Sequence, residues 1–280
     1  MIVKNFVLVS LGCVVFLSAC YSRRINLADS VVREYSFVKE IIKTNTFKLT
    51  TYSRVSEKGK PVDVYIEGDG FAWASRGKLS VDPTPTKPMV LELAGKDDSA
   101  NVLYIARPCQ YTNLKEDQFC NSKYWSSDRF SKEVIDSVND AITHFVNKYE
   151  IKGVNLIGYS GGGAVATIIA AQRKDVLSLR TVAGNLDHVE VNKYHKVTQL
   201  TNSLNAIDYA DKLSNLPQYH FSGGEDKIVP IFIAENFAEK AEKGNKCVKV
   251  AVVKGVGHEK GWVENWKYLL SQPVVCGSGK

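Results

Sequence analysis

The stretch Val154-Asn155-Leu156-Ile157-Gly158-Tyr159-Ser160-Gly161-Gly162 decides the fold that this sequence predicts. Val154 to Ile157 is a mostly apolar run that indicates a buried strand, and the alanine-rich run after Gly162 indicates a helix. Between the two lies a G-x-S-x-G pentapeptide with Ser160 at its centre. A serine on such a sharp turn stands exposed at the end of its strand, and the flanking glycines avoid collisions with the adjoining strand and helix. The alternative is a glycine-rich helix start in which Ser160 is only the N-cap.

Outward from this unit the chain alternates apolar strands with amphipathic helices. The alternation predicts the α/β class, with a mostly parallel, doubly wound sheet covered by helices on both faces. Residues 186–204 have poor periodicity and predict a small cap or loop region. The other strands are expected at 47–52, 62–66, 102–106, 179–183, 218–222 and 248–253, and the helices at 27–44, 88–94, 130–149, 162–172, 231–243 and 262–270.

Two residues that suit the activation of a serine follow later strands. Asp226 comes after the expected strand 218–222, and His258 comes after the last strand. A serine hydroxyl is a poor nucleophile unless a base takes its proton, and that base must be oriented by an acid. We therefore expect Ser160, His258 and Asp226 to act together. Rival acids are Glu225, Asp187, Asp208 and Asp211, and the remaining histidines, which occupy a helix, the cap region or a strand, are His144, His188, His195 and His220.

With Ser, Asp and His in this order, residues 47–270 resemble the α/β-hydrolase superfamily. More narrowly, segments 65–70, 107–111 and 183–187 look like those of exported bacterial lipoproteins of that superfamily whose substrates are uncharacterised. The resemblance implies a sheet of the α/β-hydrolase type and catalysis without a metal or other cofactor. It also implies an oxyanion hole made by two backbone N–H groups.

The first oxyanion donor implied by the resemblance is Gly161, directly after the serine. The second comes from the loop after strand 62–66, where Asp69 is our first choice and Gly70 the next. Many hydrolases have His-Gly in this loop, whereas this chain has Glu67-Gly68 and then Asp69-Gly70. An acidic side chain beside an oxyanion is unfavourable unless it points away or meets a cation.

The beginning of the chain predicts export and a lipid anchor. Lys4 precedes an apolar run that is long enough for a signal peptide and too short to span a bilayer. Leu17-Ser18-Ala19-Cys20 resembles the bacterial lipoprotein signal, which implies cleavage before Cys20 and triacylation, including palmitate, of that cysteine. The organisation expected is a signal peptide at 1–19, a tether at 20–26 and one domain at 27–280. An ordinary signal peptide with a chance cysteine is the alternative.

The residue after Cys20 is Tyr21, not the Asp that retains lipoproteins of enteric bacteria at the inner membrane. We therefore expect a lipid-anchored protein of the cell envelope, at the outer membrane in a Gram-negative host. Four cysteines then remain, and an even number in an oxidising compartment indicates two disulfides. Three pairings are possible, of which Cys109–Cys120 with Cys247–Cys276 is the local one. Zinc is disfavoured because no C-x-x-C or H-x₃-H spacing occurs.

Composition narrows the function classes. The 280 residues are 44% hydrophobic and carry a net charge of +6, which excludes a disordered chain and a polytopic membrane protein. The basic residues are dispersed, so no nucleic-acid partner is expected. The sequence predicts a membrane-anchored serine hydrolase of small carboxylic esters. A serine peptidase acting on short peptides, or a non-catalytic binding lipoprotein, is the alternative. Tyr111, Trp125 and Arg129 either line the substrate cleft or belong to the core.

Overall fold

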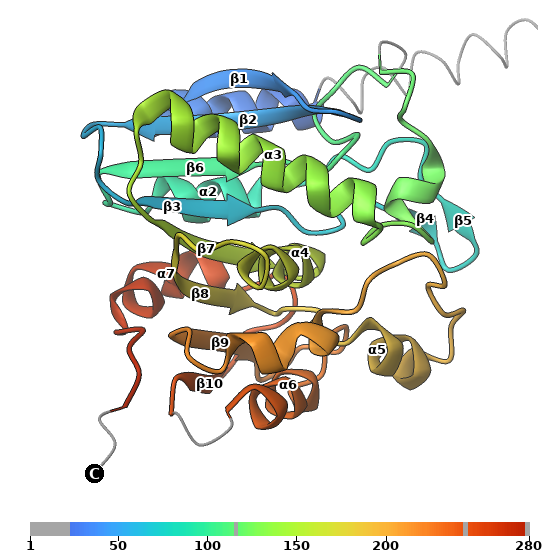
Figure 1. Cartoon of the computed structure of the whole chain (residues 1–280). Helices are drawn as coiled ribbons and strands as arrows, with labels where there is room; N and C mark the ends of the chain where they lie inside the picture. The colour runs from blue at the N-terminus through green and yellow to red at the C-terminus, as the bar shows by residue number, and fades with distance from the viewer. Residues whose placement is uncertain (1–22, 115–116, 243–245, 278–280) are drawn as a thin grey trace, which may run out of the picture.

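The computed structural model of the chain describes residues 23–114, 117–242 and 246–277 (Figure 1). The expected signal peptide at 1–19, Cys20 and the first residues of the expected tether lie outside the described residues. The first described element is a helix over residues 23–34, and strands and helices follow it along the chain. Within the described ranges, no helix is both long and apolar enough to cross a bilayer.

One sheet of eight strands runs through the molecule in the order β1-β2-β6-β3-β7-β8-β9-β10. β2 is antiparallel to both of its neighbours, and every pairing from β6 to β10 is parallel. The carboxyl ends of the parallel strands therefore share one edge. The strands are β1 (Val38–Lys43), β2 (Lys48–Val55), β3 (Val62–Ile66), β6 (Asn101–Ile105), β7 (Val154–Tyr159), β8 (Val176–Val182), β9 (Gln218–Gly223) and β10 (Val248–Val253).

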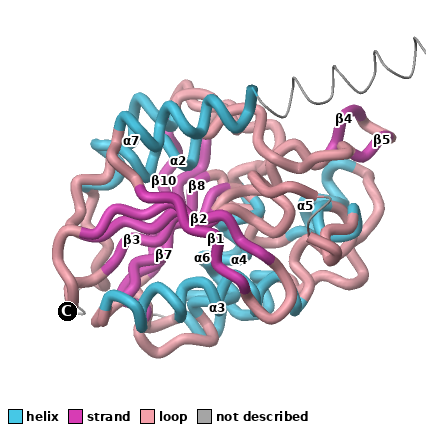
Figure 2. Tube along the Cα trace, turned by 90° about the horizontal axis from the view of Figure 1, so that it is seen from above, coloured by secondary structure: helices cyan, strands magenta, loops and turns pink. Residues whose placement is uncertain are grey.

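Helices cover both faces of this sheet, as the sequence predicts for a doubly wound fold. Figure 2 shows α2 and α7 on one face and α3, α4 and α6 on the other. Each helix turns a stripe of apolar residues toward the strands, because burying that stripe removes its surface from water. The helices are α2 (Met89–Gly95), α3 (Lys132–Tyr149), α4 (Gly161–Ala170), α5 (His188–His195), α6 (Phe232–Glu242) and α7 (Trp262–Ser271).

Two buried cores result, one on each side of the sheet. The first lies under α3, α4 and α6 and includes Val138 and Ile168. The second lies under the helix over 23–34, α2 and α7 and includes Leu91, Trp262 and Trp266. Because both faces are packed, the sheet is rigid, and the loops at its carboxyl edge are held in fixed positions.

The expected helix at 27–44 is wrong in its second half. The helix ends at residue 34, Ser36 adopts a left-handed φ of 56°, and Val38–Lys43 is the edge strand β1. The periodicity of the apolar residues suited a helix, but β-branched residues favour a strand when a partner strand is available. β2 provides that partner in an antiparallel ladder from Val38–Ser53 to Lys43–Lys48.

Two further elements have no counterpart in the sequence prediction. A short hairpin of β4 (Trp73–Ser75) and β5 (Lys78–Leu79) follows the loop after β3. The region 186–204, expected to be a cap or loop, contains α5, whose first turn is capped by Asp187 accepting hydrogen bonds from two backbone N–H groups. Both elements are too short to give a periodic signal.

Candidate active site

Ser160 lies on the turn between β7 and α4, in a backbone conformation that L-residues rarely adopt. Its φ is 50° and its ψ is −119°. Three hydrogen bonds hold the turn: Ser160 N–H donates to Val182 at 2.9 Å, and the Ser160 carbonyl accepts from Gly163 and Asn185, each at 2.9 Å. Strain of this kind persists only where surrounding contacts enforce it, and it concentrates at functional sites.

The glycines around Ser160 are required by close backbone approach. A Cβ on Gly158 would lie 2.3 Å from the carbonyl oxygen of Gly162, and a Cβ on Gly162 would lie 2.2 Å from that of Ile66. Backbone atoms cannot yield as flexible side chains do. The G-x-S-x-G pattern is therefore a packing requirement of the crossing between β3, β7 and α4.

The structure brings Ser160, His258 and Asp226 together at the carboxyl edge of the sheet. The Oγ of Ser160 lies 3.0 Å from Nε2 of His258, and Nδ1 of His258 lies 2.8 Å from Oδ2 of Asp226. A carboxylate only accepts hydrogen bonds, so Nδ1 carries the proton that it donates to Asp226. Nε2 is then left with the lone pair that can accept the Ser160 hydroxyl proton.

Asp226 is held on both oxygens. Its Oδ1 accepts hydrogen bonds from the backbone N–H groups of Ile228 at 2.8 Å and Val229 at 3.0 Å. Burial alone would raise the pKa of Asp226, but the hydrogen bonds from His258 and from these two N–H groups outweigh it and lower the pKa. The carboxylate therefore stays ionised and fixes the imidazole ring.

The loop that carries His258 is fixed through its backbone. The carbonyl of His258 accepts hydrogen bonds from the hydroxyl of Tyr159 at 3.1 Å and from Nε1 of Trp262 at 2.8 Å. The other histidines lie elsewhere. His220, for example, is buried in β9 against Thr181, and burial lowers its pKa to about 3. A neutral, buried imidazole of this kind has a structural role.

Asp69, the first choice for the second oxyanion donor, lies directly against Gly161. A Cβ on Gly161 would lie 2.1 Å from Oδ1 of Asp69. The Asp69 carboxylate forms salt bridges with Arg107 at 3.4 Å and with Arg129 at 3.2 Å. The acidic side chain thus meets two cations, the condition under which it is compatible with a nearby oxyanion. The donor roles of Asp69 and Gly161 stay predictions.

Segment 107–111, whose purpose the sequence left open, supports the loop after β3. Besides the salt bridge to Asp69, Arg107 donates to the carbonyl of Arg129, and Gln110 donates from Nε2 to the carbonyl of Gly68 at 3.0 Å. Burial lowers the pKa of Arg107, and the charge of Asp69 opposes that shift. No local pattern could have revealed these contacts, because they join residues 22 to 42 positions apart.

The salt bridges of Asp69 yield a stability prediction. Replacing Asp69 by alanine leaves the buried Arg107 without its ion-pair partner, so we expect the free energy of unfolding to fall by ~3 kcal/mol. Asp98→Ala is the matched control, because the Asp98 side chain is 86% exposed and its pair with Lys267 lies in solvent. That control should cost less than ~1 kcal/mol. Urea denaturation of the two variants measures the difference, and equal costs would contradict the proposed support.

Glu67, in the same loop, is fully enclosed. Its Oε1 accepts from the Gly68 N–H at 2.9 Å, and its Oε2 accepts from the Tyr104 hydroxyl at 2.8 Å. Burial raises the pKa of Glu67 from 4.5 to about 7, although both hydrogen bonds oppose the shift. At mildly acidic pH this carboxyl is therefore protonated and neutral beside the candidate oxyanion site.

The raised pKa of Glu67 makes stability depend on pH. The unfolded chain releases this proton near pH 4.5 and the folded chain near pH 7, so the stabilisation present below pH 4.5 is lost as pH rises through 7. We expect the Glu67→Gln variant to gain up to ~3 kcal/mol relative to wild type between these limits. Asp63, whose pKa is raised to about 6, titrates in both proteins and cancels in the comparison. Denaturation at pH 5 and pH 8 is the measurement, and parallel pH profiles for the two proteins would refute it.

Two disulfides join the cysteines that are nearest in sequence. Cys109 pairs with Cys120, with Cα atoms 5.5 Å apart, and Cys247 pairs with Cys276. The first disulfide closes the loop that follows segment 107–111. In the part of the chain that the structure describes, no group of three or more His, Cys, Asp or Glu residues is arranged to hold a metal.

A cavity of about 440 Å³ opens above Ser160. Arg129 lines it, whereas Tyr111 is buried in the second core and Trp125 is buried in a separate small cluster with Cys109. Of the three residues considered from the sequence, only Arg129 therefore belongs to the cleft. The walls combine apolar and charged residues: Glu67, Asp69, Gly70, Phe71, Ala72, Trp73, Pro85, Thr86, Lys87, Met89, Arg129, Tyr159, Ser160, Ile228, His258, Glu259 and Lys260.

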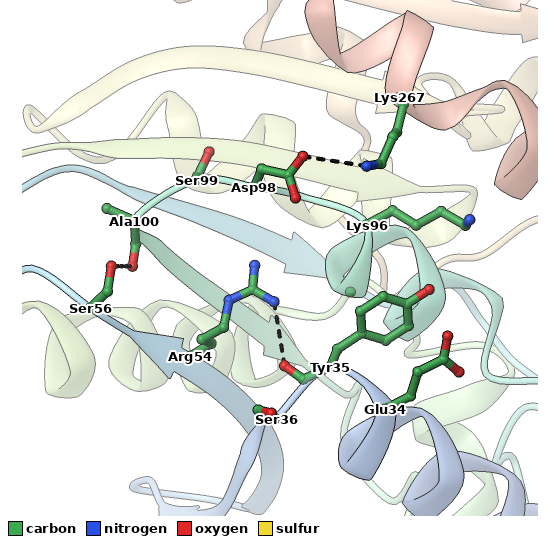
Figure 3. Close-up of a pocket in the computed structure, with 11 residues that line it drawn as sticks. Glu34, Tyr35, Ser36, Arg54, Ser56, Lys96, Asp98, Ser99, Ala100 and Lys267 are labelled. Carbon is green, nitrogen blue, oxygen red and sulfur yellow. Dashed lines mark hydrogen bonds and ion pairs between the residues drawn. The ribbon is translucent and has the colours of Figure 1, made fainter.

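A larger cavity, of about 610 Å³, lies near the amino ends of β3 and β6, away from Ser160 (Figure 3). Some of its polar groups contact each other: Lys267 pairs with Asp98 at 3.5 Å, and Ser56 donates to the Ala100 carbonyl at 2.7 Å. No histidine lines it, so its serines lack a base. The smaller cavity is therefore the candidate active site.

Comparison with known proteins gives relatives by structure alone. No protein-family model matches the sequence, and no curated protein does. Solved structures do match. The Pyrococcus furiosus esterase Pf2001 is 16% identical, with a TM-score of 0.61, and the match covers 85% of this chain and 92% of that one. Est1E from Butyrivibrio proteoclasticus is 12% identical, with a TM-score of 0.57 and coverage of 83% and 97%.

A third match is the Pyrococcus horikoshii acylaminoacyl peptidase, which is 14% identical with a TM-score of 0.59. The match covers 84% of this chain but only 41% of the length of that protein. Identities this low show a shared fold and leave the reaction to be argued from the site. The strand order, the helices on both faces and these matches agree: the chain has the α/β-hydrolase fold.

Proposed function

We propose that this chain is a serine hydrolase acting on carboxylic esters, with Ser160 as nucleophile, His258 as general base and Asp226 as the acid that orients the imidazole. One observation carries the proposal: the continuous hydrogen-bond chain from Ser160 Oγ through His258 to Asp226, with distances of 3.0 and 2.8 Å. Such a relay makes a hydroxyl reactive, because the proton has a base to go to and the charged base has a fixed counter-ion.

The reaction follows from these positions. Ser160 Oγ attacks the acyl carbonyl while His258 Nε2 takes the hydroxyl proton, and the oxyanion meets the N–H groups of Gly161 and Asp69. His258 then gives the proton to the leaving alcohol. Water, deprotonated by the same imidazole, releases the acid from the acyl-enzyme. One oxyanion donor is worth ~3 kcal/mol in such reactions.

Esters are proposed ahead of peptides because of how much of each similar solved structure the match covers. Among the listed matches covered over more than nine-tenths of their own length, the Pyrococcus furiosus protein Pf2001 is named an esterase, whereas the acylaminoacyl peptidase is covered over 41% of its own. A p-nitrophenyl ester and an aminoacyl p-nitroanilide, compared on the full chain, separate the activities. Faster turnover of the anilide would favour the peptidase.

A non-catalytic binding protein on the same fold is the remaining alternative. A fluorophosphonate probe reacts only with an activated serine, so labelling of the wild-type chain supports the enzyme. Loss of labelling in His258→Ala, with unchanged circular dichroism, would show that the activation comes from the imidazole. A wild-type chain that the probe leaves unlabelled would count against hydrolysis altogether.

We further propose that the mature chain is anchored to the cell-envelope membrane through acyl groups on Cys20. Support comes from the sequence Leu17-Ser18-Ala19-Cys20 after an apolar run. Stable anchoring needs more than one acyl chain, which triacylation supplies. We expect the wild-type chain in the membrane fraction and Cys20→Ser outside it. A Cys20→Ser chain that stays in the membrane fraction would overturn the anchor.

A further inference from the structure

Arg24 lies beside the wall of the cavity that contains Ser160. Arg24 donates from Nη1 to the carbonyls of Asp82 at 3.2 Å and Thr84 at 2.9 Å, and its guanidinium lies 4.7 Å from the centre of the Phe71 ring. Phe71 is part of the wall of the cavity that contains Ser160. Arg24 is thus tied by hydrogen bonds to the segment that precedes the wall residues Pro85 and Thr86, and by a cation–π contact to the wall residue Phe71.

Chain length then limits where a lipid on Cys20 can be. Cys20 stands three residues before Arg23, the first described residue. Three residues span at most ~11 Å even when fully extended. Acyl chains on Cys20 therefore enter a bilayer within a short distance of the cavity mouth, whatever path the intervening residues take. A long linker would let the cavity turn freely relative to the membrane. The three-residue separation between Cys20 and Arg23 restricts that freedom.

The rim of the cavity has the composition of a surface that meets a bilayer. Trp73 on β4 and Ile228 both line the cavity, yet 46% and 52% of their surfaces are exposed. Tryptophan is enriched at membrane interfaces because its ring is apolar and its N–H is polar. Figure 2 shows the β4–β5 hairpin, which carries Trp73, projecting from the body of the molecule.

Charge on the same rim complements an anionic surface. Arg76 and Lys78, on the hairpin, are exposed, as are Lys87 and Lys260 on the cavity wall. Of the acidic residues nearby, Asp82 is paired with Arg24 at 3.3 Å, which leaves Glu259 as the exposed acid of the cavity wall. Basic residues close to an anionic membrane surface each add to the attraction.

We propose that this rim, formed by Trp73, Arg76, Lys78, Lys87, Ile228 and Lys260, docks on the anionic bilayer that holds the acylated Cys20, and that the substrate is an acyl ester of a membrane lipid. The inference rests on the proposed serine hydrolase and its anchor, and it names the substrate class for that site. The lipid acyl group passes to Ser160 Oγ, the lipid alcohol leaves with the proton from His258, and water then releases the fatty acid.

Trp73 provides a direct measurement of docking. The other three tryptophans, Trp125, Trp262 and Trp266, are at most 6% exposed, so quenching of tryptophan fluorescence by brominated lipids reports on Trp73. The lipid-modified full chain, inserted in phosphatidylcholine vesicles with or without phosphatidylglycerol, should be quenched more strongly with the anionic lipid. Trp73→Phe should abolish that quenching and so assign it.

Hydrolysis of the vesicle lipid tests the consequence. Arg76→Ser combined with Lys78→Ser should slow fatty-acid release from anionic vesicles about thirtyfold, the factor to which ~1 kcal/mol for each of the two lost charges converts. Hydrolysis of a soluble short-chain ester should be unchanged, since neither residue lines the cavity. Lys58→Ser combined with Lys60→Ser, between β2 and β3 at the opposite edge of the sheet, removes the same charge and should leave both rates unaltered.

The outcomes separate the claims. A lipid-modified chain that hydrolyses the short ester, but shows no quenching or no difference between the two double variants, overturns the docking and leaves the serine hydrolase intact. An unmodified Cys20, found by mass spectrometry, also overturns the inference, because nothing then places the membrane. A chain that hydrolyses neither substrate and resists the fluorophosphonate probe overturns the proposed function instead.

Discussion

Ser160→Ala is expected to lower kcat/KM for a p-nitrophenyl ester by at least ~10⁴-fold and to abolish labelling by a fluorophosphonate probe. The loss is large because the variant has no atom that can form the acyl-enzyme, and what remains comes only from binding and oxyanion stabilisation. Among the described residues, the side chain of Ser160 has one hydrogen-bond partner, His258. Its removal should therefore change the melting temperature little.

A matched control distinguishes chemistry from folding. Ser178→Ala removes a hydroxyl that is similarly buried, in β8, and that donates to Asn155 at 2.7 Å near the amino end of the sheet. This variant should keep full probe labelling even where it costs some stability. Hydrolysis that survives in Ser160→Ala at more than a few per cent of the wild-type rate would show that another residue is the nucleophile.

Asp226→Asn is expected to lower kcat by about 10⁴-fold near neutral pH, with the fold retained. The amide oxygen can still accept the two N–H groups that Oδ1 accepts, from Ile228 and Val229. The amide nitrogen, in the place of Oδ2, would donate to Nδ1 of His258, so the ring proton would move to Nε2. Nε2 could then no longer accept the Ser160 proton.

The rival acid next in sequence provides the control for this variant. Glu225 is exposed, and its backbone N–H donates to the carbonyl of Val256 at 2.8 Å. Glu225→Gln should therefore keep kcat within about twofold of wild type, because a substitution at an exposed side chain usually changes a free energy by no more than ~0.5 kcal/mol. If Glu225→Gln were the slower enzyme, the assignment of the acid would be wrong.

The parts of the site that the sequence revealed share one property: each is marked by its own neighbours. Gly158 to Gly162 form a motif because the serine turn needs small residues within a few positions. Asp226 and His258 each follow an apolar strand of a parallel sheet, and such strands end at the same edge. The closeness of these residues in space could be inferred because the sequence already predicted a parallel sheet.

The contacts that support the loop after β3 could not be inferred in this way. Arg107, Arg129 and Gln110 are ordinary residues by local pattern, and the sequence raised Arg129 only as one residue of a possible cleft. Their contacts with Asp69 and Gly68 exist because β3 and β6 pair in parallel, which sets the loops that follow them side by side. The value of such a contact depends on burial, which local sequence does not specify.

The strand β1 shows the same limit at the level of the fold. Val38, Ile41 and Ile42 are compatible with a helical stripe as well as with a strand, and hydrogen bonds from β2 decided between them. The sequence by itself determined the order of elements, the serine turn and the residue types that complete its relay, because each rests on the chemistry of adjacent residues. Tertiary structure alone decided which charges neutralise one another around Asp69 and that Arg24 packs against the cavity wall at Phe71, because both depend on packing between segments that are distant along the chain.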